Sequence, residues 1–302
     1  MKPVLFSVSY AGLWGQHALG VEEFVRHAAL LGYAGVELMG KRPHLSALEW
    51  SDDRLAGLAD VCAEVDVQVA CVAAYTDFIG GVEVAEVPFA EIQVLYVARL
   101  AAMAEALGCG LVRVFTSYER DDLPLAENWR RTVAALQDCC DRAADHGVTI
   151  GIQNHHDVAV HSKALLELLG DVDRANCRLM FDPWSPCLRG AEPFETARSM
   201  APHTVYTTFA DYVRLPRFHY QPALVNYAAL PVDLARAVPM GEGDLANAEF
   251  VRGLRAGGYD GPIAYEMCSP VRGGGSLENL DRCARRFLDW LAEVERDQAD
   301  RG

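Results

Sequence analysis

The chain has few basic residues for its length. Its 302 residues include 27 lysines and arginines against 42 aspartates and glutamates, which gives a formal net charge of -15. Proteins that bind nucleic acid gain much of their affinity by neutralising phosphates with lysine and arginine. An acidic chain would repel a phosphate backbone, so the composition argues against nucleic acid as a partner.

Long apolar runs are also missing. The first fifteen residues hold one lysine and then an apolar stretch of strand length, which Ser7, Ser9 and Tyr10 interrupt. A signal peptide needs a longer apolar region, and a membrane-spanning helix needs about twenty apolar residues. We therefore expect a cytoplasmic protein with no membrane partner.

Paired cysteine motifs are absent as well. The nine cysteines are scattered and form no C-x-x-C pair: Cys62, Cys71, Cys109, Cys139, Cys140, Cys177, Cys187, Cys268 and Cys283. An odd, scattered set is typical neither of a disulfide framework nor of a structural zinc site. We expect reduced thiols, most of them buried.

The sequence contains neither a domain linker nor a dinucleotide-binding motif. No stretch rich in proline, glycine and serine separates two halves, so residues 1–302 are expected to form a single domain. No G-x-G-x-x-G turn follows the first apolar strand, which argues against an open doubly wound sheet, the main alternative.

What the sequence does contain is a repeated phrase. A helical segment ends in Leu-Gly, Gly-Gly or His-Gly and is followed by an apolar strand, as in LGYAGVELMG (31–40), HGVTIGIQNHHD (146–157) and GGYDGPIAYEMCSP (257–270). Glycine suits the left-handed residue that ends a helix before a strand. The phrase and its intervals predict eight parallel strands, at 4–9, 35–39, 67–73, 111–115, 148–153, 178–182, 204–209 and 262–266. Eight strands alternating with amphipathic helices favour a closed (β/α)8 barrel.

In such barrels the catalytic groups lie at the carboxyl ends of the strands. The polar residues predicted there are Glu37, Thr76, Asp77, Arg113, Thr116, Gln153, Asn154, His155, His156, Asp182, Thr208, Asp211 and Glu266. Each carboxylate could instead cap a helix or form an ion pair. Three of them, Glu37, Asp182 and Glu266, however, each end an apolar strand and are expected at the same end of the barrel. On an extended backbone adjacent side chains point to opposite faces, so only one of His155 and His156 is expected to face the mouth.

Three loops add candidates for substrate binding. The loop after the second strand carries Lys41, Arg42 and His44, which we expect to grip substrate oxygens. Residues 267–276 (MCSPVRGGGS) offer Arg272 and a helix N-terminus to an anion, or form a plain turn in which Ser276 caps the closing helix 277–296. The long connection 212–245, with Arg217 and His219, is expected to cover the site; packing over the surface is the alternative.

The strand ends resemble those of the xylose isomerase-like barrels, the sugar phosphate isomerase/epimerase superfamily. The resemblance runs to the segment MGEGDLANAEFVRGLRAGGYDGPIAYE at 240–266. It implies one divalent metal held by Glu, Asp, His and Glu after strands five to eight. Here these positions are Gln153, Asp182, Thr208 and Glu266, so half of that ligand set is altered.

The altered ligands change the expected chemistry. Mn²⁺, Mg²⁺ or Zn²⁺ is a candidate cofactor, held by Asp182, Glu266 and Gln153 with help from His156 or His219. Glu266 is the expected base, His156 a second acid/base, and Gln153 replaces the second base of an epimerase although an amide cannot take up a proton. Glu37, Asn154, Arg113 and Asp211 complete the expected substrate contacts.

Two function classes follow from the sequence. The first is an isomerase, epimerase or related lyase that acts on a sugar, keto-sugar or polyol. The second is a divergent, metal-free barrel that works as a lyase, a binding protein or the partner subunit of an enzyme. A nuclease related to endonuclease IV is disfavoured, because the chain is acidic and no histidine follows the third or fourth strand. Barrels of the superfamily often pair, so a homodimer is kept as a candidate assembly.

Overall fold

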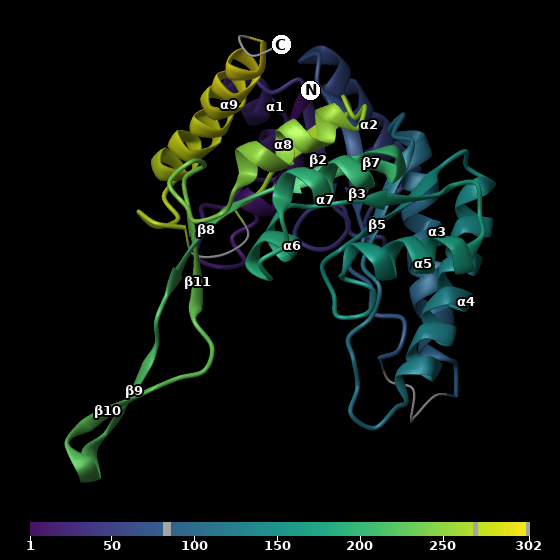
Figure 1. The fold of residues 1–302 in the computed structure, drawn as a ribbon. Helices are drawn as coiled ribbons and strands as arrows, with labels where there is room; N and C mark the ends of the chain where they lie inside the picture. Colours follow the sequence, from purple (N-terminus) through teal and green to yellow (C-terminus); the bar gives the residue numbers. More distant parts are fainter. Residues whose placement is uncertain (81–85, 268–270, 300–302) are drawn as a thin grey trace.

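Eight parallel strands close into a barrel in the computed structural model, which describes residues 1–80, 86–267 and 271–299 (Figure 1). The order of hydrogen-bonded neighbours is β1-β12-β7-β6-β5-β4-β3-β2. The strands are β1 (Lys2–Phe6), β2 (Gly35–Met39), β3 (Gln68–Ala73), β4 (Leu111–Val114), β5 (Thr149–Gln153), β6 (Cys177–Met180), β7 (Thr204–Phe209) and β12 (Pro262–Tyr265). The predicted (β/α)8 barrel is confirmed.

The first strand differs most from its predicted range of 4–9. It ends at Phe6, and residues Ser7–Tyr10 form the short 3-10 helix η1. This turn lets two buried hydroxyls accept backbone hydrogen bonds: Ser7 Oγ from Met39 N at 2.8 Å, and Ser9 Oγ from Met267 N at 2.9 Å. Satisfying these neighbouring amides favours the turn over a longer strand.

Helices surround the barrel in chain order. They are α1 (Val21–Leu31), α2 (Asp52–Glu64), α3 (Phe89–Ala106), α4 (Leu125–Ala144), α5 (Ser162–Val172), α6 (Trp184–Leu188), α7 (Pro193–Met200), α8 (Asn247–Ala256) and α9 (Leu277–Ala299). Short 3-10 turns also occur at η2 (Ala201–His203) and η3 (Pro222–Leu224). The predicted joint after α1 is present: Gly32 has φ 96° in the left-handed region.

The thiols are free and mostly buried, as expected. Eight cysteines lie in the described part of the chain, and all are buried except the partly exposed Cys187. Cys268 lies outside the described residues. Within the described residues, no helix is both long enough and apolar enough to cross a membrane.

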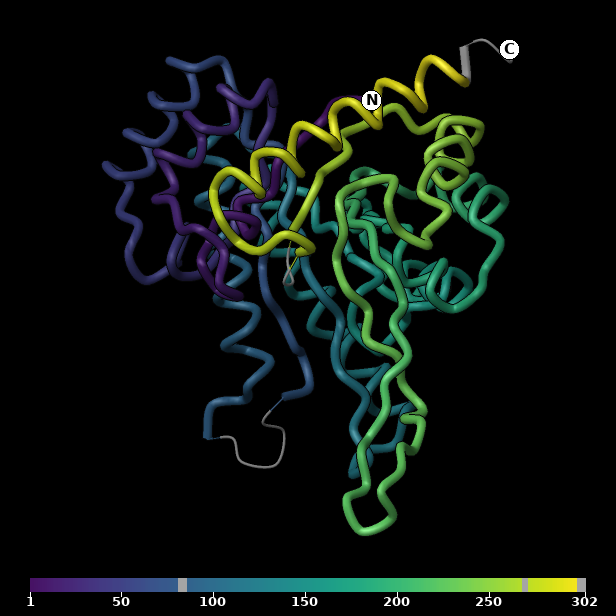
Figure 2. Tube along the Cα trace, turned by 90° about the vertical axis from the view of Figure 1, so that its left-hand side faces the viewer, coloured from purple at the N-terminus to yellow at the C-terminus, as the bar shows by residue number. Residues whose placement is uncertain are grey.

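A β-ribbon interrupts the alternation after β7. We call residues 211–238 the arm. Its base pairs β8 (Asp211–Leu215) with β11 (Leu234–Val238), and its outer part pairs β9 (Phe218–Gln221) with β10 (Asn226–Ala229). Figures 1 and 2 show the arm projecting away from its own barrel. The expectation that 212–245 covers the chain's own mouth is therefore wrong, because the antiparallel pairing extends this segment outward.

Candidate functional site

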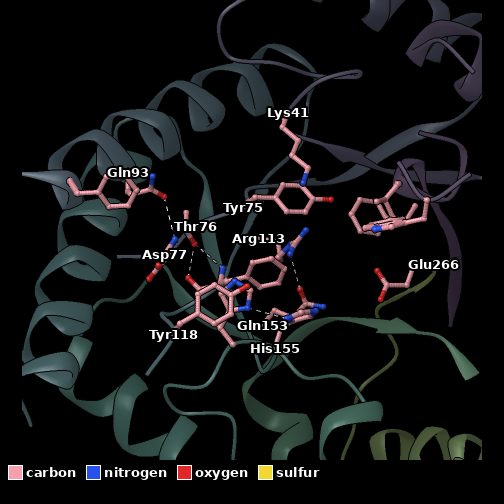
Figure 3. A pocket seen from close by; sticks show the side chains of 16 residues that line it. Lys41, Tyr75, Thr76, Asp77, Gln93, Arg113, Tyr118, Gln153, His155 and Glu266 are labelled. Atoms are coloured by element: carbon pink, nitrogen blue, oxygen red, sulfur yellow. Dashed lines mark hydrogen bonds between the residues drawn. The ribbon is translucent and has the colours of Figure 1, made fainter. Parts of the chain in front are cut away.

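A pocket of about 550 Å³ opens at the carboxyl ends of the barrel strands (Figure 3). Its lining comes from the ends of β1 to β5 and of β12, and from the start of α3. The lining residues are Phe6, Val8, Trp14, Lys41, Tyr75, Thr76, Asp77, Phe89, Gln93, Arg113, Phe115, Tyr118, Gln153, His155, His156 and Glu266. The location agrees with the catalytic mouth of other barrels.

Arg113 forms the centre of this site. It lies near the end of β4, is only 2% exposed, and stacks its guanidinium 4.0 Å from the ring centre of Phe115. One Nη donates to Gln153 Oε1 at 3.0 Å, and Nε lies 4.0 Å from Glu37 Oε1. A buried charge needs such partners, because removal from water is costly otherwise. Arg113 therefore supplies a fixed positive charge in the lining of the pocket.

Gln153 links this arginine to Asp182. Its Nε2 donates to Asp182 Oδ2, while the other carboxylate oxygen accepts from Thr208 N at 2.6 Å. The orientation of the amide follows from its neighbours, since the arginine requires an acceptor and the carboxylate requires a donor. Asn154 holds the Asp182 backbone by two hydrogen bonds, of 2.8 and 3.0 Å.

Two carboxyl groups near Arg113 have shifted acidity. Burial raises the pKa of Asp182 to about 8, although hydrogen bonds from Gln153 and Thr208 oppose the shift. Burial likewise raises the pKa of Glu37 to about 8 against the attraction of Arg113. Both groups are buried, and neither lines the pocket. They shape the electrostatics of the floor.

Both histidines after β5 line the pocket, so the expectation that only one faces the mouth is wrong. The strand ends at Gln153 and the chain turns, which releases the two rings from strict alternation. Their Nδ1 atoms lie 3.1 Å apart. Burial lowers the pKa of His155 to about 3 and that of His156 to about 4, so both imidazoles are neutral at pH 7.

Glu266 and Lys41 approach the cavity from other sides (Figure 3). Glu266 follows β12, and its backbone N–H donates to Phe209 O at 3.0 Å, which continues the barrel ladder and holds the residue at the mouth. Lys41 follows β2 and places Nζ 3.6 Å from the ring centre of Tyr75. Partial burial, and then Arg113, lower the pKa of Lys41.

The residues expected to hold a divalent cation are not arranged as a ligand set. In the described part of the chain, no three His, Cys, Asp or Glu side chains converge as a metal site. Gln153 turns its nitrogen toward Asp182 and gives its oxygen to Arg113. His156 lies between the rings of Phe115 and Tyr118, with centroid distances of 4.2 and 4.1 Å. As placed, these residues do not fit a divalent cation.

Of the expected substrate contacts, several lie away from the pocket. Arg42 pairs with Glu49 at the surface, at 2.5 Å. His44 is buried, with Nε2 3.1 Å from Leu19 O and its ring stacked on Phe24. The polar loop after β2 therefore places only Lys41 at the cavity.

The loop before α9 also departs from expectation. Arg272 points to Glu242, at 3.6 Å, instead of the pocket. Ser276 accepts from Asn279 N at 3.3 Å, as an N-cap does. Residues 268–270 of the expected anion loop lie outside the described residues.

Five more of the expected site residues lie outside the pocket lining. Glu37 and Asn154 form the layer beneath the pocket. Asp211 lies at the base of the arm, where its carboxylate accepts from the N–H groups of Tyr212, Gly241 and Gly243. Arg217 and His219 are exposed on the arm, because β8 and β9 carry them outward. None of these five residues lines the pocket.

Sequence reasoning missed the aromatic wall. Phe6, Trp14, Tyr75, Phe89, Phe115 and Tyr118 all line the cavity. Tyr75 and Phe115 closely follow β3 and β4, so the strand ends did contain a signal. The predicted site residues were all polar, whereas ligand pockets are commonly lined by aromatic residues as well.

Known structures share this fold. A xylose isomerase domain protein from Planctomyces limnophilus is similar at 20% identity and a TM-score of 0.69, over 99% of this chain and 98% of that one. A probable 3-DHS dehydratase from Bacillus anthracis has 17% identity and a TM-score of 0.70, over 97% of this chain and 99% of that one. A D-psicose 3-epimerase from Clostridium cellulolyticum H10 has 14% identity and a TM-score of 0.72, over 97% of this chain and 99% of that one.

Sequence comparisons support the same assignment. No curated protein matches the chain. The family model described as xylose isomerase-like TIM barrel, however, matches residues 25–294. The chain therefore belongs to the xylose isomerase-like TIM barrel family.

Proposed function

We propose that this chain is an enzyme that moves a proton on a small keto-sugar or related polyhydroxylated carbonyl compound. The observation that carries the proposal is the pocket itself, in which one carboxylate, Glu266, faces the cationic groups Lys41 and Arg113 (Figure 3). Its volume of about 550 Å³ suits a small ligand.

The charges support proton abstraction next to a carbonyl. Glu266 would accept the proton, and the negative charge would develop on the carbonyl oxygen. Lys41 and Arg113 are placed to stabilise that charge in a site of low dielectric. His155 and His156, both neutral, would orient hydroxyl groups by hydrogen bonds. His156 was expected as a second acid/base. Its lowered pKa of about 4 leaves it neutral at pH 7, which suits a hydrogen-bonding or base role and not the role of an imidazolium acid.

A lyase is the second candidate, and one observation favours it over a symmetric epimerase. Epimerisation with two bases needs a second proton acceptor across the substrate from Glu266. The corresponding position holds Gln153, whose amide is engaged by Arg113 and Asp182. Dehydration can use one base, because the carboxylic acid formed when Glu266 takes the α-proton can return that proton to the leaving hydroxyl, which departs as water. A similar solved structure is named as a probable dehydratase.

Solvent exchange tests the proposal for any product that the enzyme forms. The purified enzyme is incubated in D₂O with a panel of ketopentoses, ketohexoses and hydroxylated cyclic ketones, and C–H exchange is followed by proton NMR. We expect exchange with at least one compound. Glu266→Gln should slow it about 100-fold or more, because a positioned general base contributes roughly 10²–10⁴.

Asp77→Asn is the matched control. Asp77 also lines the pocket, but its Oδ1 accepts from Ile79 N within its own loop, at 3.3 Å. This variant should keep most of the exchange rate, and circular dichroism should show both variants folded. Full exchange by Glu266→Gln, or no exchange with any compound in the panel, would contradict the proposal.

A further inference from the structure

The arm carries a large share of the exposed apolar side chains of the protein. Seventeen large hydrophobic side chains are exposed in the described residues, and eight of them lie on the arm. These are Leu215, Phe218, Tyr220, Leu224, Val225, Tyr227, Val232 and Leu234. An isolated two-stranded ribbon is marginally stable in water, and clustered exposed apolar residues mark an interaction surface. We therefore expect another protein surface to pack against the arm.

The base of the arm fixes its direction. Asp211 accepts three backbone hydrogen bonds there, and Arg214 N donates to Asp244 at 2.8 Å. A Cβ on Gly243 would lie 2.0 Å from the Asp211 carboxylate, so the packing leaves no slack. The arm leaves on the mouth side and points away from its own barrel (Figures 1 and 2). These contacts hold the base of the arm in this outward direction.

A second set of exposed apolar side chains lies on segments that contribute to the pocket lining or lie next to such segments in the chain. We call this set the rim; its members are Trp14, Val87, Ile92, Leu95, Tyr118 and Leu125. Trp14 and Tyr118 also line the pocket, so two members of the rim belong to the site as well. Arm and rim together hold fourteen of the seventeen exposed large hydrophobic side chains of the described residues. Both surfaces lie on the mouth side of the chain.

Their charges are complementary. The arm exposes three arginines, Arg214, Arg217 and Arg236, against one exposed acid, Asp233, and no side chain in the described residues forms an ion pair with these arginines. In the loop that follows β4, Arg120 pairs with Asp122, and Glu119 and Asp121 remain exposed, within a chain of net charge -15. The exposed arginines of the arm in one copy are therefore opposite in charge to the acidic loop beside the rim in another copy. Opposite charges favour association of the two surfaces.

We infer that the chain forms a two-fold homodimer in which the arm of each copy lies across the rim of the other. A two-fold axis uses both surfaces twice and closes the assembly. The stretch of chain from the base at Asp211 to the tip at Leu224 spans roughly 40 Å when extended, which is sufficient to reach across a facing mouth. Arg217 and His219, remote from their own pocket, then stand at the edge of the pocket in the second copy.

Sedimentation of the full chain tests the assembly. At micromolar concentration we expect a species of twice the 33.1 kDa chain mass. Phe218→Asp with Tyr227→Asp should raise the dimer dissociation constant at least about 100-fold, since buried aromatic anchors dominate interface energies. Leu30→Asp with Leu48→Asp is the matched control, because both leucines are exposed but lie outside arm and rim. The control should remain dimeric.

Cross-linking tests where the arm binds, independently of any enzyme activity. A photoreactive benzoylphenylalanine replaces Tyr227, and ¹⁵N-labelled and unlabelled chains are mixed before irradiation. We expect cross-links of mixed isotope between the arm and residues 86–95 or 118–125. A monomeric chain, a dimer that survives both arm substitutions, or mixed cross-links only to other faces would overturn the inference. So would a stable arm complex with a different protein but no self-association.

Discussion

Replacing Gln153 by Glu probes the chain of contacts that runs from Arg113 through Gln153 to Asp182. The substitution keeps the side-chain length but turns the amide donor that faces Asp182 into a carboxyl oxygen. Two acids then meet in a buried place where burial already raises the pKa of Asp182 to about 8. We expect the pair to share one proton, as close carboxylates do, with Arg113 still paired to the new glutamate.

The size of the effect follows from the contact that is lost. A hydrogen bond to a charged group contributes about 1.5–3 kcal/mol, so Gln153→Glu should lower the free energy of unfolding by about 2 kcal/mol near pH 8. For a chain of 302 residues, with an unfolding entropy of about 2 cal/mol/K per residue, this is a fall in Tm of roughly 3 °C. The raised pKa of the pair means that the folded state binds more protons. Stability should therefore fall as the pH rises through the pair's folded pKa, and recover below it.

The substitution also restores one ligand of the implied metal site. Thermal unfolding with excess Mn²⁺ or with chelator should show stabilisation of Gln153→Glu by about 2–3 kcal/mol, the gain expected at about 100 times Kd. Gln153→Met is the matched control: it loses the same hydrogen bonds but should not respond to Mn²⁺, and its pH dependence should come only from the buried acids already present, Asp182 and Glu37. If the wild-type protein were stabilised by Mn²⁺ as strongly as the glutamate variant, the roles assigned to Gln153 and Arg113 would be refuted.

Two pairs of substitutions test the role of the buried charge and the close packing of the backbone. Arg113→Met leaves Gln153 and Glu37 buried without their cation and should destabilise the fold by about 3–5 kcal/mol in urea unfolding, whereas Arg113→Lys, which keeps the charge, should cost less; equal losses would contradict the role of the charge. Gly40→Ala places a Cβ 2.9 Å from Ala73 O and 2.7 Å from a Leu100 methyl, and should cost about 1–3 kcal/mol. Gly57→Ala, in open space within α2, should instead stabilise the protein by about 0.5–1 kcal/mol, and a loss comparable to that of Gly40→Ala would argue against a steric cause.

The sequence identified the site only in part. Lys41, Arg113, Gln153, His156 and Glu266 were expected at the mouth, and all five line the pocket. Arg42, His44 and Arg272 were expected beside them but form contacts elsewhere. A loop residue's neighbours depend on how the loop folds back on distant parts of the chain, and spacing along the sequence does not contain that information.

The barrel itself was readable because its signals are local. Glycine after each helix and an apolar run in each strand are properties of a few consecutive residues, so the eight predicted strands agree with the structure within a few positions. Only the tertiary structure decided that Arg113 is joined through Gln153 to Asp182, since these residues come from the ends of three different strands. It likewise decided that 211–238 forms an outward arm, because antiparallel pairing and the hydrogen bonds of Asp211 act between segments far apart in the chain.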